Sequence, residues 1–421
     1  MIKRIAALTF IFVCTAVAWV ILGATIFART YSAGDRLETK VASSWGSAQV
    51  QTPPTAAYWV TRTKTEETLQ NGQRILRQVP ESTRVPLPLE SSRVNVALHL
   101  DPRQKGLLWY STYAVDFAGA YRFTNTSSED EAVSFQLKFP AAHAVYDDLA
   151  VLVDGQPAII RTDSNGATAT VTLPAGKPVS LSFSYRSQGM GSWVYRFGDD
   201  VSQVHDFALN MKTNFKEVDF PQDTLSPTEK RETPDGWELT WKYNNLLSGL
   251  QIGTTMPEKL QPGPLAGQIS FFAPVSLFFF FFLMFIITTL RGIELHPMNY
   301  FFLATAFFAF HLLMAYLVDH ISIHWAFVIC SAVSVFLVVS YLRLVVGIRF
   351  AAVEAGLAQL IYLVLFSYAF FFKGFTGLAV TIGSIITLFV VMQMTGKIKW
   401  AEKFAAKPAP QPAFSSGGLH D

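Results

Sequence analysis

Cysteine, charge and catalytic motifs are all scarce in this chain. The two cysteines, Cys14 and Cys330, lie in long apolar stretches, so the polar middle of the chain must fold without disulfides. Charged residues make up 15% of the 421 residues. Soluble domains carry roughly 25%, and the shortfall indicates that lipid forms part of the solvent. Lysine and arginine form no basic strip with interleaved aromatics, so we expect no nucleic-acid partner.

The sequence also lacks the motifs that identify common enzyme classes. Walker-type phosphate loops and the His-Glu-x-x-His pair of zinc hydrolases are absent. The motifs Ser-x-x-Lys and Gly-x-Ser-x-Gly are absent or out of context. We therefore predict a protein that is not an enzyme and that holds no cofactor and no metal ion.

Long apolar runs, by contrast, are abundant. Six of them approach the roughly 20 residues that an α-helix needs to cross a bilayer. They cover residues 5–28, 270–290, 297–318, 324–345, 350–372 and 374–394. The first follows Lys3 and Arg4 and exceeds the roughly 7–15 apolar residues of a signal peptide, so we interpret it as a retained anchor. The sequence predicts an α-helical transmembrane bundle of about six spans.

Basic residues in the short loops predict the orientation of these spans. Most of them share one side: Lys3, Arg4, Arg291, Arg343, Arg349, Lys397, Lys399, Lys403 and Lys407. The opposite side carries Asp319, His320 and a single Lys373. Because cytoplasmic loops are enriched in Lys and Arg, both termini are expected in the cytoplasm and the large domain in the periplasm.

These features divide the chain into five parts. A cytoplasmic N-terminus (1–4) and the anchor (5–28) precede a periplasmic β-rich domain (29–267). A five-helix transmembrane region (268–395) and a cytoplasmic tail (396–421) follow. The tail is rich in Pro, Ala, Ser and Gly, a composition typical of disordered segments.

Within the β-rich domain the hydrophobic period becomes two. Apolar and polar residues alternate over 133–139, which is typical of a strand with one buried face. The alternation recurs at 149–153, 169–173, 179–185 and 237–243. Asp154-Gly155 and Asn165-Gly166 are suited to the tight turns between such runs. We predict an all-β, sandwich-like extracytoplasmic domain built from antiparallel strands.

The N-terminal part of this domain has a less regular pattern. Residues 35–49 are expected to form a short helix that leaves the membrane. Further on, Pro80, Pro86 and Pro88 predict an irregular join between strands, because proline interrupts regular backbone hydrogen bonding.

Ionisable side chains in and beside the spans are candidates for chemistry. His311 lies deep in the third span, Asp319 and His320 lie at its outer end, and His324 begins the next span. His311 either has a functional role or bonds, as a neutral histidine, to a neighbouring helix. The four residues are of types that bind metal, although their spacing matches no tight ligand motif.

Three further groups leave two interpretations open. Arg343 and Glu354 either pair across the turn between adjacent spans or extend to the lipid headgroups. The acidic pairs at 147–148 and 199–200 either bind calcium or, as we favour, solvate loops. Aromatic residues of the domain either line a ligand groove or fill the core, the commoner role at strand spacing. These aromatics are Trp109, Tyr110, Tyr113, Trp193, Tyr195, Trp237 and Trp241.

Several motifs resemble the CreD family of bacterial inner-membrane proteins. In the membrane region these are ISFFAPV at 269–275, HPMNY at 296–300, VDHI at 318–321 and KIKW at 397–400. In the domain, LSPTEKR at 225–231 and GWELTW at 236–241 look like the family's late periplasmic segment. The resemblance covers nearly the whole chain. It implies a link to cell-envelope integrity, colicin tolerance and β-lactam response, but no reaction and no catalytic residue.

We therefore predict a non-enzymatic inner-membrane protein that contacts the lipid bilayer and whose periplasmic domain binds an unidentified envelope protein or ligand. The candidate functional residues are His296, Pro297, His311, Asp319 and His320. One alternative is a transporter or channel for a small solute or lipid. Another is an intramembrane metal-dependent hydrolase built on His311, Asp319, His320 and His324.

Overall fold

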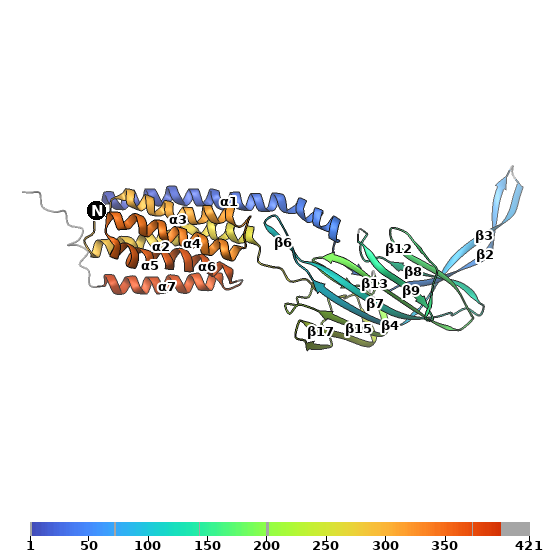
Figure 1. The fold of residues 1–421 in the computed structure, drawn as a ribbon. Helices are drawn as coiled ribbons and strands as arrows, with labels where there is room; N and C mark the ends of the chain where they lie inside the picture. The colour runs from blue at the N-terminus through green and yellow to red at the C-terminus, as the bar shows by residue number, and fades with distance from the viewer. Residues whose placement is uncertain (1, 71–72, 143, 199–201, 373, 397–421) are drawn as a thin grey trace, which may run out of the picture. The chain divides into compact units, whose positions relative to one another are not determined.

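The computed structural model describes residues 2–70, 73–142, 144–198, 202–372 and 374–396. The chain divides into a helical unit, Met1–Tyr31 with Pro262–Asp421, and a strand-rich unit, Ser32–Gln261 (Figure 1). Three sequence predictions lie outside the described residues: the acidic pair 199–200, Lys373, and the tail from residue 397 onward.

The helical unit has the six predicted spans. Among the described residues, six helices are long and apolar enough to cross a membrane. They are α1 (Ile2–Trp45), α2 (Pro262–Leu290), α3 (Pro297–Leu317), α4 (Ile323–Val345), an irregular fifth helix (Phe350–Phe371) and α7 (Thr376–Thr395). In hydrocarbon every backbone N–H must bond within its own segment, so even Phe- and Val-rich runs become helical. The predicted helical bundle is confirmed.

The fifth helix changes its winding several times. It begins with a π-helix, η1 (Phe350–Ala355), and continues through α5 (Gly356–Gln359) into a second π-helix, η2 (Leu360–Leu365). A short α6 (Phe366–Tyr368) and a 3₁₀ turn, η3 (Ala369–Phe371), end it. π-helical turns are rare and often occur at functional sites.

The strand-rich unit contains two large sheets and two small ones among its described residues. The larger has the order β10-β9-β13-β7-β4-β15-β17-β16, and the second has the order β11-β12-β8-β2-β3. The first comprises β4 (Leu89–Leu100), β7 (Thr112–Thr124), β9 (Tyr146–Val153), β10 (Gln156–Pro157), β13 (Pro178–Met190), β15 (Ser202–Thr213), β16 (Glu229–Glu232) and β17 (Trp237–Ser248). The second comprises β2 (Thr55–Gln70), β3 (Gln73–Leu87), β8 (Glu131–Lys138), β11 (Ile160–Thr162) and β12 (Gly166–Leu173). The small sheets join β1 (Gln49–Gln51), β14 (Ser192–Tyr195) and β18 (Ile252–Thr255), and β5 (Arg103–Lys105) with β6 (Leu108–Tyr110).

All five runs of alternating hydrophobicity are strands, namely β8, β9, β12, β13 and β17, which confirms the β-rich domain. Their apolar faces form one core that both large sheets share. The rings of Phe123 on β7 and Phe135 on β8, for example, have centroids 5.7 Å apart. Most pairings are antiparallel, as predicted, but β4 pairs with β15 and β1 pairs with β14 in parallel. These partners lie far apart in sequence, so no local turn sets their direction.

Of the three prolines predicted to mark an irregular join, Pro88 lies between β3 and β4, as predicted, but the other two lie in a long hairpin. Pro80 and Pro86 are inside β3, where they face Thr63 and Ala57 of β2. The prediction was wrong for Pro80 and Pro86 because β3 is the edge strand of its sheet, where prolines can be accommodated with their missing N–H on the unpaired side. β2 pairs with β8 only at Thr55–Ala57, and beyond that point β2 and β3 extend as a two-stranded ribbon (Figure 1). Between these two strands the sequence reads Asn71-Gly72, a pair favoured in hairpins, and our sequence analysis overlooked this indication of a hairpin.

The helix predicted for 35–49 is the last part of α1, and it stops at Trp45. Gly46 ends it by adopting a φ of +105° while its N–H donates to the Ala42 carbonyl over 2.9 Å. A Cβ at Gly46 would lie 2.2 Å from the carbonyl oxygen of Gln188. Only glycine fits this reversal, because both the dihedral and the space exclude a side chain.

Candidate functional sites

The candidate residues in the membrane region are distributed along the whole of α3. His296 and Pro297 begin the helix, His311 lies in it, and Asp319 and His320 follow its end. With a rise of about 1.5 Å per residue, such a helix separates its two ends by about 30 Å. The structure therefore does not bring these residues into one site, and each must be considered by itself.

His296 and Pro297 start the helix. The Nδ1 atom of His296 accepts a hydrogen bond from the backbone N–H of Met298 at 3.2 Å, and Pro297 occupies the first helical turn. Proline is favoured there because its missing N–H would be unpaired in any case. Their motif in the sequence thus has a local structural explanation.

His311 is completely buried between helices. Its Nδ1 lies 3.0 Å from the Phe307 carbonyl, one turn earlier in α3, so Nδ1 carries the proton and Nε2 is an acceptor. The ring packs edge-on against Trp19 of α1, with centroids 5.7 Å apart. Neither Nε2 of His311 nor Nε1 of Trp19 has a hydrogen-bond partner among the described residues. An acceptor and a donor are thus buried without partners in one helix interface, a costly arrangement. Trp19 was not singled out from the sequence.

Asp319 forms an ion pair with a residue that the sequence analysis missed. Nη1 of Arg29, near the outer end of the first span, lies 3.3 Å from Oδ2 of Asp319. Arg29 also donates to the Ala315 carbonyl over 2.7 Å and lies 5.6 Å from the ring centroid of Tyr316. His320, the next residue, is exposed. The sequence could have indicated Arg29 as a candidate, because this arginine directly follows an apolar run of 24 residues, 5–28.

A second arginine, Arg4, contacts neighbouring helices at the other end of the first span. Arg4 donates through Nη2 to the hydroxyl groups of Thr288 on α2 and Tyr300 on α3, at 3.2 Å each. Its guanidinium also lies 5.5 Å from the ring centroid of Phe285. Together with Arg29 and Asp319, these contacts hold α1 against α3 at both ends of the membrane-spanning part.

Glu354 pairs with a different arginine from the one considered. Its Oε1 accepts from the Arg291 guanidinium at the end of α2, whereas Arg343 is exposed. Oε2 of Glu354 is buried and has no hydrogen-bond partner among the described residues. Arg291 was missed because 63 positions separate it from Glu354, and only helix packing brings the two together.

The ligand set of the predicted alternative hydrolase does not assemble. In the described part of the chain, no group of three or more His, Cys, Asp or Glu side chains is placed to hold a metal ion. His324 is exposed and packs against Phe371, with ring centroids 5.4 Å apart, away from His311. In the domain, Asp147 and Asp148 are exposed, as expected of solvated groups, but they lie in β9 and not in a loop. Asp148 lies 3.7 Å from Arg186.

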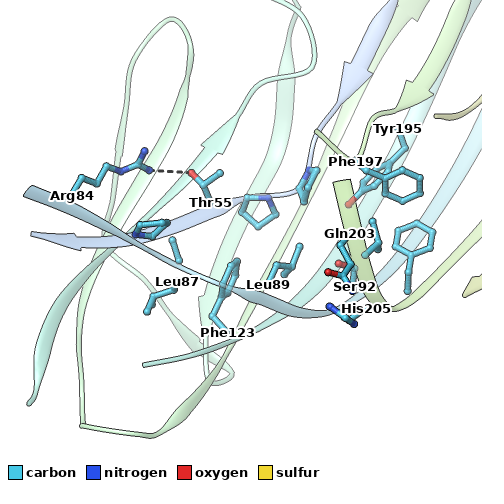
Figure 2. A pocket seen from close by; sticks show the side chains of 16 residues that line it. Thr55, Arg84, Leu87, Leu89, Ser92, Phe123, Tyr195, Phe197, Gln203 and His205 are labelled. Atoms are coloured by element: carbon cyan, nitrogen blue, oxygen red, sulfur yellow. Dashed lines mark hydrogen bonds between the residues drawn. The ribbon is translucent and has the colours of Figure 1, made fainter. Parts of the chain in front are cut away.

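The strand-rich unit has a pocket at the base of the β2–β3 ribbon, where the two large sheets and β14 meet (Figure 2). Its volume is about 310 Å³. Apolar rings dominate its lining: Pro53, Pro54, Pro86, Phe123, Tyr195, Phe197 and Phe207. Thr55, Arg84, Gln203 and His205 are the exposed polar residues among those that line it. A pocket of this composition suits an apolar side chain or a short peptide segment.

The floor of the pocket is aromatic and uncharged. Phe197 and Phe207 contact edge to face, with centroids 4.9 Å apart, and Tyr195 contacts both rings. Burial raises the pKa of Tyr195, although the hydrogen bond from Tyr121 works in the opposite direction. Of the seven aromatics considered from sequence, Tyr195 is the one that lines this pocket. Tyr113, Trp193 and Trp241 are fully buried core residues, the commoner role expected of them.

Six apolar helices together with a large strand-rich unit define a polytopic integral membrane protein that carries a folded β domain. A family model described as inner membrane protein CreD matches residues 1–401. The chain belongs to the CreD family of inner membrane proteins, which confirms the resemblance seen in its motifs.

Solved structures show only weak likenesses to this chain. A proposed nutrient-binding protein from Legionella pneumophila matches with a TM-score of 0.32 and 11% identity, over 46% of this chain and 71% of that one. An M1 zinc metallopeptidase from Deinococcus radiodurans matches with a TM-score of 0.28 and 10% identity, over 40% of this chain and 42% of that one. At such TM-scores neither likeness carries an argument. The comparison with curated proteins gave no match.

Proposed function

We propose that this protein supports cell-envelope integrity without catalysing a reaction, and that its strand-rich domain binds an envelope partner in the periplasm. The observation that carries the binding role is the aromatic pocket at the base of the ribbon (Figure 2). A preformed apolar hollow with a few polar groups at its edge is the usual form of a recognition site. The family's association with the envelope supports the cellular role.

The β2–β3 ribbon adds a second element to the proposed binding surface. Described side chains are exposed at 61–65 and again at 80–84. Arg84 and Thr55, which form a hydrogen bond of 3.5 Å, lie both on the ribbon strands and at the pocket. Beyond Ala57 both edges of this ribbon carry backbone groups with no neighbouring strand among the described residues, and a partner gains binding energy by adding a strand there.

The proposed orientation, with both termini in the cytoplasm, is supported by where the basic residues lie beside the spans. Arg291, Arg343 and Arg349 lie at or beside the helix ends of one side. Arg29 belongs to the opposite side, but its charge is neutralised by Asp319. Arginines beside the spans are therefore more numerous on the side assigned to the cytoplasm.

Labelling with a membrane-impermeant thiol reagent tests the orientation. In a Cys14→Ser background, Glu129→Cys places a thiol in the strand-rich domain and Glu294→Cys places one between α2 and α3, both at exposed positions. We expect the thiol at position 129 to react in spheroplasts and that at position 294 to react only after lysis. The reverse pattern would exclude the proposed orientation.

Complementation of a strain that lacks this protein tests the function. Dye uptake and sensitivity to β-lactams and detergent should rise on deletion and return to normal with the wild-type chain. The double variant Gln203→Ala, His205→Ala alters the pocket edge, and Gln156→Ala, Arg161→Ala alters exposed residues outside it. We expect only the control pair to rescue fully at equal protein level.

The other outcomes are equally informative. Full rescue by the pocket variant would show that the pocket is not needed for this function. If deletion changes neither dye uptake nor sensitivity to β-lactams and detergent, the proposed role in envelope integrity is wrong. If His311→Phe, rather than the pocket variant, abolished rescue, a transport role of the helical unit would replace binding by the domain.

A further inference from the structure

The helical unit has an apolar groove that neither the family assignment nor the proposed function accounts for. It has a volume of about 540 Å³ and lies between α2, the fifth helix and α7. Each helix contributes apolar residues to it, among them Phe279, Leu283, Ile361, Leu365, Val380 and Gly383. A hollow of this size and lining, in a segment that lies in lipid, has the dimensions and chemistry of an acyl-chain site.

The irregular winding of the fifth helix helps to form one wall of this groove. Both π-helical segments contribute lining residues, Glu354 from η1 and Tyr362 from η2. The Ser276 hydroxyl of α2 donates to the Tyr362 carbonyl, and the Tyr362 hydroxyl donates to Oγ1 of Thr387 on α7 over 2.9 Å. Tyr362 thus connects α7 to the bundle by a polar contact. Within α7 only Thr387 and Val391 are buried, so most of this helix does not pack tightly against its neighbours.

One end of the groove carries two opposite charges with unused hydrogen-bonding capacity. Glu354 lines the groove with 16% of its side chain exposed, and its Oε2 has no partner among the described residues. Arg291 binds the other oxygen and keeps 55% of its side chain exposed. A carboxylate oxygen without a partner requires a hydrogen-bond donor, preferably a cationic one, and a guanidinium is suited to phosphate.

We propose that this groove binds one phospholipid with a primary-ammonium headgroup, that is, phosphatidylethanolamine. Oε2 of Glu354 is buried in the structure, so the carboxylate turns toward the groove when the lipid binds and then accepts from the ammonium. The phosphate binds Arg291, and one acyl chain lies in the groove between the fifth helix and α7. The Glu354–Arg291 pair has no net charge, which favours a zwitterionic headgroup over an anionic one. Phosphatidylcholine has no N–H to donate to the carboxylate, so the site distinguishes the two zwitterionic lipids.

The chain offers a matched pair of variants that tests the groove. Gly383 lines it and Gly377 does not, yet a Cβ at either position meets no atom within 4 Å. Both glycines are exposed in α7, Gly377 in its first turn and Gly383 in its interior, so both Gly→Leu changes add the same apolar side chain to an exposed helix position. Only the first fills the groove.

The test measures lipids that co-purify with the full chain, by native mass spectrometry. The protein is equilibrated with equal amounts of phosphatidylethanolamine, phosphatidylcholine and phosphatidylglycerol of identical acyl chains. We expect the wild type and Gly377→Leu to retain phosphatidylethanolamine about tenfold over phosphatidylcholine, the factor that a charge-assisted hydrogen bond provides. Gly383→Leu should lose bound lipid of every class, and Glu354→Gln should bring the ratio near one.

Three results would overturn the proposal. One is a wild-type ratio near one, which indicates ordinary solvation by lipid. Another is equal lipid loss in both glycine variants, and the third is a preference for phosphatidylglycerol, which assigns the headgroup contact to Arg291 alone. Circular dichroism and gel filtration confirm that each variant folds. If Gly383→Leu does not fold, the headgroup ratio of Glu354→Gln against wild type decides the question.

Discussion

Arg29 and Asp319 connect α1 to the end of α3, with Nη1 and Oδ2 3.3 Å apart, although 290 positions separate them in the chain. Both side chains are about one-third exposed, so their attraction alone contributes modestly, about 0.2–1 kcal/mol. Arg29 makes two further contacts, to the Ala315 carbonyl and the Tyr316 ring. The arginine therefore contributes more to helix packing than its ionic partner does.

We predict that Arg29→Ala destabilises the protein more than Asp319→Ala. The expected losses are about 1–2 kcal/mol for the arginine, which makes three contacts, and at most about 1 kcal/mol for the aspartate. Equilibrium unfolding of the full chain in mixed micelles measures both, and the double variant gives their coupling energy. Equal losses from the two single variants would show that the contacts to Ala315 and Tyr316 contribute nothing.

His311 is expected to tolerate replacement by an apolar ring. His311→Phe removes the unpaired Nε2 and keeps the contact with Trp19, so stability should stay within about 1 kcal/mol of wild type. His311→Ala leaves a cavity and should cost about 2–4 kcal/mol. The same unfolding assay measures both variants. A large loss for His311→Phe would mean that Nε2 has a partner on which the fold depends.

Gly46 should be far less replaceable than other glycines with positive φ. In Gly46→Ala the new Cβ meets the Gln188 carbonyl oxygen at 2.2 Å, and we expect a loss above about 3 kcal/mol. Gly155→Ala is the control, since Gly155 also has a positive φ, +78°, but open space around it. Its loss should be about 1 kcal/mol, from the backbone conformation alone. Similar losses at both sites in thermal unfolding would contradict the predicted clash.

The outer part of the β2–β3 ribbon should be dispensable for folding. Thr61 and Ser82 face each other across the ribbon, with their hydroxyl groups 3.0 Å apart. Replacing residues 62–81 by Asn-Gly keeps this pair and closes a two-residue hairpin. We expect unfolding of the full chain to change by less than about 1 kcal/mol, because the described side chains removed are mostly exposed. If the domain no longer folds after this replacement, the outer part of the ribbon contributes to the stability of the domain core, and the prediction is wrong.

Buried tyrosines should make the strand-rich domain sensitive to alkali. Burial raises the pKa of Tyr121 and Tyr185 well above the ordinary value of 10.0, and raises that of Tyr146 to about 12. Above about pH 10 the unfolded chain releases these protons while the folded chain retains them. Stability is therefore unaffected below that pH and falls as the pH rises further, by about 1.4 kcal/mol per pH unit for each fully buried tyrosine.

Unfolding of the full chain, followed by tyrosinate absorbance between about pH 9 and pH 12, measures this slope. Tyr121→Phe removes one titrating group and should lower the slope, whereas replacing the exposed Tyr31 by Phe should not. Tyrosinate absorbance that rises before the domain unfolds would contradict the predicted retention of protons.

The sequence by itself determined the six apolar helices, five of the strands and the family. Apolar runs long enough to cross a bilayer must be helical there, and alternation such as that at 133–139 suits only a strand with one buried face. These are local properties, so they can be predicted without knowledge of the fold. The HPMNY and VDHI motifs were likewise sufficient to indicate the CreD family.

Only the tertiary structure decided which residues meet. Arg29 with Asp319, and Arg291 with Glu354, pair across helices that are distant in sequence. The aromatic pocket and the apolar groove likewise combine residues from several elements, including a fifth helix whose π-helical turns no hydrophobic pattern indicates. Such contacts depend on how helices and sheets pack together, whereas sequence periodicity reports only which face of each element is apolar.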